Sequence, residues 1–170
     1  RIILRWPKTN PVTGRDLDSH LQIPDNASNT FKVYYPANNQ KYYYATDNHT
    51  CDSCSSDQLS DNVTIDKDDQ TPPGDETITI SKVRSGTYSF SVHNLTNSDN
   101  SSNYKTNLRR SGAKVKVLYN KGGTLISKKF HVPNDNGTLW RVFTFDKDAS
   151  GPFTRLKTME IEQTDGSAIY

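Results

Sequence analysis

The 170-residue sequence is poor in several features that would assign it to a familiar class. It has two cysteines, one methionine and only 32% hydrophobic residues. No run of about 18 apolar residues is present, so we expect no membrane-spanning helix and no membrane insertion. Neither sign of charge is in excess, because 21 basic residues stand against 19 acidic ones. A near-neutral balance argues against a dedicated nucleic-acid-binding protein, so no nucleic-acid partner is expected.

Sequence motifs of common enzymes are also missing. The chain contains no G-x-S-x-G elbow, no H-E-x-x-H helix and no glycine-rich phosphate loop. His20 lies two residues from Asp18, but a solvated or hydrogen-bonded histidine is a simpler interpretation than a catalytic dyad. We therefore predict that the protein is not an enzyme, with no catalytic residues and no required cofactor.

What the sequence does contain is a succession of short alternating segments. Helical periodicity is nearly absent, whereas period-2 alternation recurs between clusters of Gly, Pro, Asn and Asp. In 17–23, for example, Leu17, Leu21 and Ile23 should face a core, and Asp18 and His20 should face water. The pattern predicts one all-β domain over 1–170, an antiparallel β-sandwich of about ten strands. Strands are expected at 1–6, 17–23, 31–35, 41–45, 76–80, 87–93, 113–119, 124–131, 138–145 and 155–162.

The turns between these segments carry recognisable turn residues. Asn, Gly and Asp cluster at 120–123 and at 134–137, and we expect both to close hairpins. The segment 84–86 is expected to do the same before Tyr88. The stretch 94–107 is rich in Asn and Ser and is predicted to be a long polar loop.

Six N-x-S/T acceptor sites are spread along the chain. About three would be expected by chance from its Asn, Ser and Thr content. Because an N-linked glycan is bulky and solvated, the excess favours a secreted glycoprotein with its acceptors on the surface. The chain begins at Arg1 rather than Met, and we expect it to be a processed form. A biased composition is the alternative explanation. The acceptors are Asn26, Asn48, Asn62, Asn94, Asn100 and Asn136.

The two cysteines, Cys51 and Cys54, are three positions apart in a polar segment. In an oxidising compartment one disulfide between them is the simplest expectation. A zinc site would need further ligands, and only His49 is near in sequence; free thiols are the third alternative.

Two acidic segments are candidates for binding a hard cation. Asp residues at i and i+2 on one strand project to the same side, so two such segments from different loops could converge. Ca²⁺ is the ion considered, and the alternative is that these acids solvate turns and cap strand ends. The candidate ligands are Asp16, Asp18, Asp66, Asp68 and Asp69.

Several runs together resemble a family of secreted β-sandwich domains, the mostly uncharacterised YfaP-type domains of bacterial and some protist surface proteins. The resemblance extends from about Arg1 to Phe145 and implies an immunoglobulin-like or transthyretin-like sandwich without catalytic activity. The segment with Cys51 and Cys54 and the many acceptor sites depart from the family pattern. The runs are Trp6-Pro7, Arg15–Leu21, Phe31–Tyr35, Ile65–Asp69, Gly74–Ile80, Gly86–His93 and Ser111–Val117.

Two functions are expected on these grounds. The first is a structural or interaction subunit of an extracellular fibre or coat, a head-to-tail homopolymer in which a terminal strand pairs with a neighbour's sheet. The expected assembly strand consists of Arg1, Ile2, Ile3, Leu4, Arg5 and Trp6. The alternative is a calcium-dependent module that binds a carbohydrate or another ligand through the acidic segments.

Overall fold

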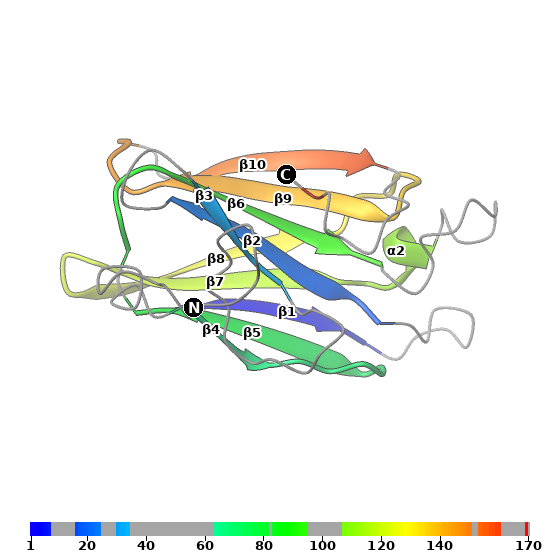
Figure 1. Cartoon of the computed structure of the whole chain (residues 1–170). Coiled ribbons are helices and arrows are strands. Elements are labelled where there is room, and N and C mark those ends of the chain that lie inside the picture. Colours follow the sequence, from blue (N-terminus) through cyan, green and yellow to red (C-terminus); the bar gives the residue numbers. More distant parts are fainter. Residues whose placement is uncertain are drawn as a thin grey trace.

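The computed structural model describes residues 1–7, 16–24, 30–34, 63–81, 83–94, 107–150, 153–160 and 169. These residues form ten strands and one helix of four residues, and the strands make two antiparallel sheets that pack face to face (Figure 1). The predicted all-β antiparallel sandwich is therefore confirmed. In the described ranges no helix has the length and apolar character needed to cross a bilayer.

Each sheet contains five strands, and each is built from segments distant in sequence. The first sheet has the order β4-β5-β1-β7-β8, and the second has the order β10-β9-β6-β2-β3. The first comprises β1 (Ile2–Trp6), β4 (Val63–Lys67), β5 (Gly74–Ile80), β7 (Lys114–Lys121) and β8 (Thr124–His131). The second comprises β2 (Asp18–Pro24), β3 (Thr30–Val33), β6 (Thr87–His93), β9 (Leu139–Asp146) and β10 (Phe153–Glu160), and α2 (Asn107–Arg110) precedes β7.

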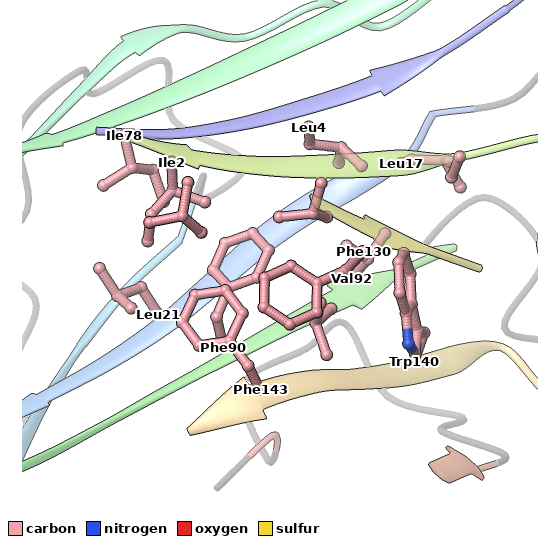
Figure 2. Packing of buried hydrophobic residues seen from close by; sticks show 14 of the residues in the cluster. Ile2, Leu4, Leu17, Leu21, Ile78, Phe90, Val92, Phe130, Trp140 and Phe143 are labelled. Atoms are coloured by element: carbon pink, nitrogen blue, oxygen red, sulfur yellow. The ribbon is translucent and has the colours of Figure 1, made fainter. Parts of the chain in front are cut away.

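The core lies between the two sheets and is built from the alternate residues of each strand, as period-2 patterning requires. Leu4 and Val115 from the first sheet are fully buried, as are Leu21 and Phe90 from the second. Figure 2 shows rings from three strands meeting at the centre. The ring of Phe143 stacks on Phe90, with centroids 5.4 Å apart, and on Phe130 at 5.0 Å.

The N-terminal strand β1 lies in the middle of its sheet. It pairs with β5 on one side and with β7 on the other, both antiparallel. The backbone of Arg1 extends this pairing, because its amino group donates to the Leu118 carbonyl at 2.9 Å. Both edges of β1 are thus used within the chain. The strand expected to be lent to a neighbour is instead a central strand of its own domain, which corrects that assignment.

Of three segments expected to form hairpin turns, one does so and two connect the two sheets. The turn at 120–123 closes the β7–β8 hairpin, with Gly122 and Gly123 at positive φ and the Gly123 amide bonded to the Asn120 side chain at 2.8 Å. The segments 84–86 and 134–137 are not hairpins, because each connects strands of opposite sheets. Strand β4 is not among the ten expected strands, and the expected strand at 41–45 lies outside the described residues.

Candidate functional site

Carboxyl groups from both sheets gather at one end of the sandwich. It is the end at which β4 leads into β5 (Figure 1). Asp16 and Asp18 lie at the start of β2, and Glu76 lies near the start of β5. One carboxylate oxygen from each of the three residues lies within 4.8 Å of the others. We call Asp16, Asp18 and Glu76, together with the neighbouring Asp68, the acidic cluster.

Strand pairing explains why Glu76 points into the protein. Glu76 is opposite Leu4 on β1 and precedes Ile78 by two positions. Leu4 and Ile78 both face the core, so alternation places the Glu76 side chain on that same buried side. Only 2% of Glu76 is exposed. The sequence therefore commits a carboxyl group to the interior at this end of β5.

Glu76 also joins the two sheets. Its Oε2 atom accepts a hydrogen bond of 2.7 Å from the backbone N–H of Ser19 on β2. A buried bond from a backbone amide to a carboxylate is charge-assisted and holds both partners in place. The bond fixes the start of β2, and with it the positions of Asp16 and Asp18, relative to the first sheet.

On the same buried face of the β1–β5 ladder, the pair following Leu4 and Glu76 is Trp6 and Gly74. A Cβ atom at Gly74 would lie only 2.1 Å from the Trp6 ring, so glycine is required for the indole to occupy this place. Trp6 is 2% exposed. Tight packing therefore excludes any larger residue from position 74 beside the acidic cluster.

Several polar atoms at this end have no hydrogen-bond partner in the described part of the chain other than a neighbouring carboxyl group, which for Glu76 is that of Asp68. They are Glu76 Oε1, Asp16 Oδ1 and the indole nitrogen of Trp6, all of which are buried. An unsatisfied buried polar group costs about 1–3 kcal/mol, and each such group in a native fold calls for an explanation. Two of the three atoms are carboxylate oxygens, which are ligands for a hard cation.

The pKa values in the cluster are shifted in the direction that opposes ionisation. Burial raises the pKa of Asp16 to about 6, and the Asp68 carboxylate adds to the rise. Burial also raises the pKa of Glu76 well above its usual value, with the negative charge of Asp18 as the second cause. Burial raises the pKa of Asp68, and a hydrogen bond with Glu76 partly offsets this rise. Within the described ranges Asp16, Asp68 and Glu76 have no ion pair with a basic side chain.

The structure brings together only part of the predicted ligand set. Asp16, Asp18 and Asp68 come close, as expected from two converging acidic segments. Asp66 instead forms an ion pair of 3.1 Å with Arg1, and Asp69 forms one of 2.8 Å with Lys67. Asp66 and Asp69 thus lie outside the acidic cluster and have basic partners, and their assignment as ligands stays a prediction.

Glu76 was missed by the sequence interpretation although a signal was present. It lies two positions before Ile78 and four before Ile80 in a strand expected to bury both isoleucines. An acidic residue on the same side of a strand as buried isoleucines is itself expected to be buried. Buried acidic residues are rare unless they are paired or coordinate a metal.

The outward-facing residues of β2 also differ from expectation. Asp18 and His20 were expected to face water, but both are 3% exposed. The His20 ring stacks on Tyr34 with centroids 5.2 Å apart and meets the edge of His93 at 5.7 Å. This part of the second sheet is covered on both faces, and alternation alone did not reveal it.

Most of the predicted modification sites lie beyond the part of the chain that the structure describes. This applies to Asn26, Asn48, Asn62 and Asn100, and also to Cys51 and Cys54. The other two acceptors differ from each other: Asn136 is exposed after β8, whereas Asn94 is only 1% exposed. A glycan on Asn94 is incompatible with this fold, so that acceptor is corrected and Asn136 stays a prediction.

A second concave region lies at the opposite end of the sandwich. It is an open cavity of about 640 Å³ between the two sheets, lined mainly by apolar and aromatic side chains. Its aromatic lining includes Tyr88, Tyr119, Phe145 and Phe153, and its charged residues are Arg1 and Lys147. It lacks carboxylates and is chemically unlike the acidic cluster.

Comparison with known proteins shows the fold and little else. No family model and no curated protein matches this chain. A solved structure titled "Crystal structure of unknown function protein SAV2460" is similar, with a TM-score of 0.53 and 15% identity over 96% of this chain and 90% of that one. Similarity at this identity supports the same two-sheet sandwich. Membership of the YfaP-type family stays a prediction.

Proposed function

We propose that this protein is an extracellular β-sandwich module that binds Ca²⁺ in the acidic cluster, where the ion links the two sheets. The observation that carries the proposal is Glu76. It is a buried carboxylate that accepts the Ser19 amide across the sheets and otherwise faces other carboxyl groups, those of Asp16, Asp18 and Asp68.

The spacing of the oxygens agrees with a shared ion. Ca²⁺ binds oxygen at about 2.3–2.6 Å, so two of its ligands lie at most about 5 Å apart. The three carboxylate oxygens are within 4.8 Å of one another. The donor set consists of carboxylates alone, which favours a hard cation over zinc or copper. Asp68 is close enough to Glu76 to supply a fourth carboxyl group.

The position of the cluster argues for a structural ion rather than one that bridges to a sugar. Asp18 and Glu76 are 3% and 2% exposed, so a ligand approaching from solvent would not reach an ion held between them. Ca²⁺ here would neutralise carboxylates that otherwise repel one another across two sheets. Extracellular modules commonly bind Ca²⁺ at about 10⁻⁴–10⁻³ M, which suits the predicted secreted location.

Direct titration tests the proposal. We expect chelator-treated protein to release or absorb heat when CaCl₂ is added, and to enhance Tb³⁺ emission excited through tryptophan. Glu76→Gln should abolish both signals. Asp135→Asn, which removes an exposed carboxylate in the β8–β9 connection, should leave both unchanged. Absence of heat and of Tb³⁺ emission in the unaltered protein would sink the proposal.

Secretion and glycosylation are part of the proposal and are supported by the excess of acceptor sites, with Asn136 exposed as a glycan requires. Deglycosylation of protein from its native source, followed by mass measurement, checks them. Head-to-tail polymerisation stays a prediction, and with β1 paired on both sides it would need a different strand.

A further inference from the structure

The outer face of the first sheet carries a group of exposed basic side chains over β1, β7 and β8. They share one face because each strand contributes alternate residues, and every one of them is exposed. We call this group the basic face. It consists of Arg5 on β1, Lys114 and Lys116 on β7, and Lys129 and His131 on β8.

Strand register arranges these residues in two rows across the sheet. Lys116 is directly opposite Lys129. In the next row Lys114 lies between Arg5 on β1 and His131 on β8. Neighbouring strands are about 4.8 Å apart and alternate residues about 7 Å apart, so the basic groups form a compact, regular array.

This arrangement opposes the stability of the sheet. Like charges directly opposite on an antiparallel pair are destabilising, whereas one acid at either position would form a stabilising pair. Within the described ranges Lys114, Lys116 and Lys129 have no ion pair. Arg5 has Asp75 at 3.9 Å, but Asp75 also accepts a hydrogen bond from Lys67. Packing therefore gives no reason for the two opposed lysines, which points to an external anion.

We propose that the basic face binds a linear acidic polysaccharide, that is, a chain of sugars carrying carboxylate or sulfate groups. An extended polymer lies flat on a sheet, and its repeating anions match repeating cations. The outward side chains of β1, β7 and β8 include no Phe, Tyr or Trp on which nucleic-acid bases would stack. The strongly exposed apolar residue on this face is Leu125 at the β7–β8 turn, and one leucine is a weak anchor for a bilayer.

The test measures binding of heparin and of polygalacturonate, with neutral dextran as the reference polymer, at two salt concentrations. The variant Lys116→Ala/Lys129→Ala removes the opposed pair. The matched control, Lys121→Ala/Lys147→Ala, removes the same charge from exposed positions outside the basic face. We expect the first variant to bind at least tenfold more weakly and the control to change by less than about twofold.

Salt dependence gives an independent readout. Each lost contact removes roughly one counterion from the slope of log affinity against log salt, so the slope should fall by about two in the first variant. Equal losses in the two variants would overturn the proposal. So would acidic polysaccharides that bind no better than dextran.

Two further measurements separate binding from folding and identify the class of polymer. Lys116→Arg/Lys129→Arg should restore binding, and Lys129→Glu should abolish binding while raising the melting temperature through a new pair with Lys116. Loss of binding that follows loss of stability would contradict the proposal. Duplex DNA, single-stranded DNA and phosphatidylserine vesicles are tested in parallel. Tighter lysine-dependent binding of any of these than of heparin would overturn the polysaccharide assignment.

Discussion

Replacing Glu76 by Gln is expected to change the stability of the protein in opposite directions with and without Ca²⁺. The substitution keeps the size of the side chain and leaves a carbonyl oxygen that can accept the Ser19 amide. It removes one negative charge from a site where burial and Asp18 already oppose ionisation. Any difference in behaviour therefore reflects charge rather than lost packing.

Without Ca²⁺ the variant should be the more stable protein. It no longer carries a buried carboxylate in need of a counter-charge, and such a group costs about 1–3 kcal/mol. For a chain of this length 1 kcal/mol corresponds to about 2–4 °C in Tm. We expect a gain of roughly 2–12 °C in the presence of chelator.

With Ca²⁺ the order should reverse. An ion present at 100 times its Kd stabilises the folded state by about 2.7 kcal/mol, which is roughly 5–11 °C for the unaltered protein. The variant lacks a central ligand and should show little or no shift. Thermal melts in chelator and in a CaCl₂ series, with Asp135→Asn as control, give both quantities. A variant less stable than the unaltered protein in chelator, or equally stabilised by Ca²⁺, would refute the reasoning.

Three further predictions follow from the same end of the sandwich and from the acceptor sites. Gly74→Ala should destabilise the protein by about 1–3 kcal/mol, measured by urea unfolding, because the added Cβ meets the Trp6 ring. In chelator, stability should fall as pH rises from about 4 to 6 or above. Because the pKa of Asp16 is raised, the folded state keeps a proton that the unfolded state loses near pH 3.8. The pKa shift corresponds to a stability change of about 3 kcal/mol, which we reduce to about 1–2 kcal/mol because Asp16 is partly exposed. Thermal melts that become more stable with rising pH would contradict this. Asn136→Gln should reduce the mass of secreted protein by one glycan, whereas Asn94→Gln should not, because Asn94 is buried.

The sequence was a good guide to strands and a poor guide to what surrounds them. The expected strands at 87–93 and 124–131 match β6 and β8 at their observed bounds, and the alternation of Tyr88, Phe90 and Val92 places one face of β6 in the core. Alternation failed to identify β4, because this five-residue strand runs into an acidic segment and itself contains Asp66. It also failed for His20, because alternation predicts which side a residue faces but not whether another part of the protein covers that side.

The candidate site was half predictable for a related reason. The sequence showed that two acidic segments exist, and strand spacing showed that Asp16 and Asp18 project together. It did not show which partner each carboxylate finds. Arg1 reaches Asp66 only through the β4–β5–β1 pairing, which joins residues 65 positions apart, whereas Lys67 pairs with Asp69 two positions away rather than with the adjacent Asp66 or Asp68. Neutralised and unneutralised acids are alike in sequence and differ only in the folded protein.

Net charge is a weak guide to binding for the same physical reason. A value of +2 argues against a dedicated nucleic-acid-binding protein, but the sum is formed from groups that the fold separates. Acidic side chains of the cluster lie inward at one end of the sandwich, where a proton or a cation neutralises them. Lysines of β7 and β8 lie outward on an open sheet face, where they act on whatever approaches from solvent. Since screening limits such interactions to about 8–10 Å, the proposed binding of an acidic polysaccharide depends on the local array of lysines and not on the total charge.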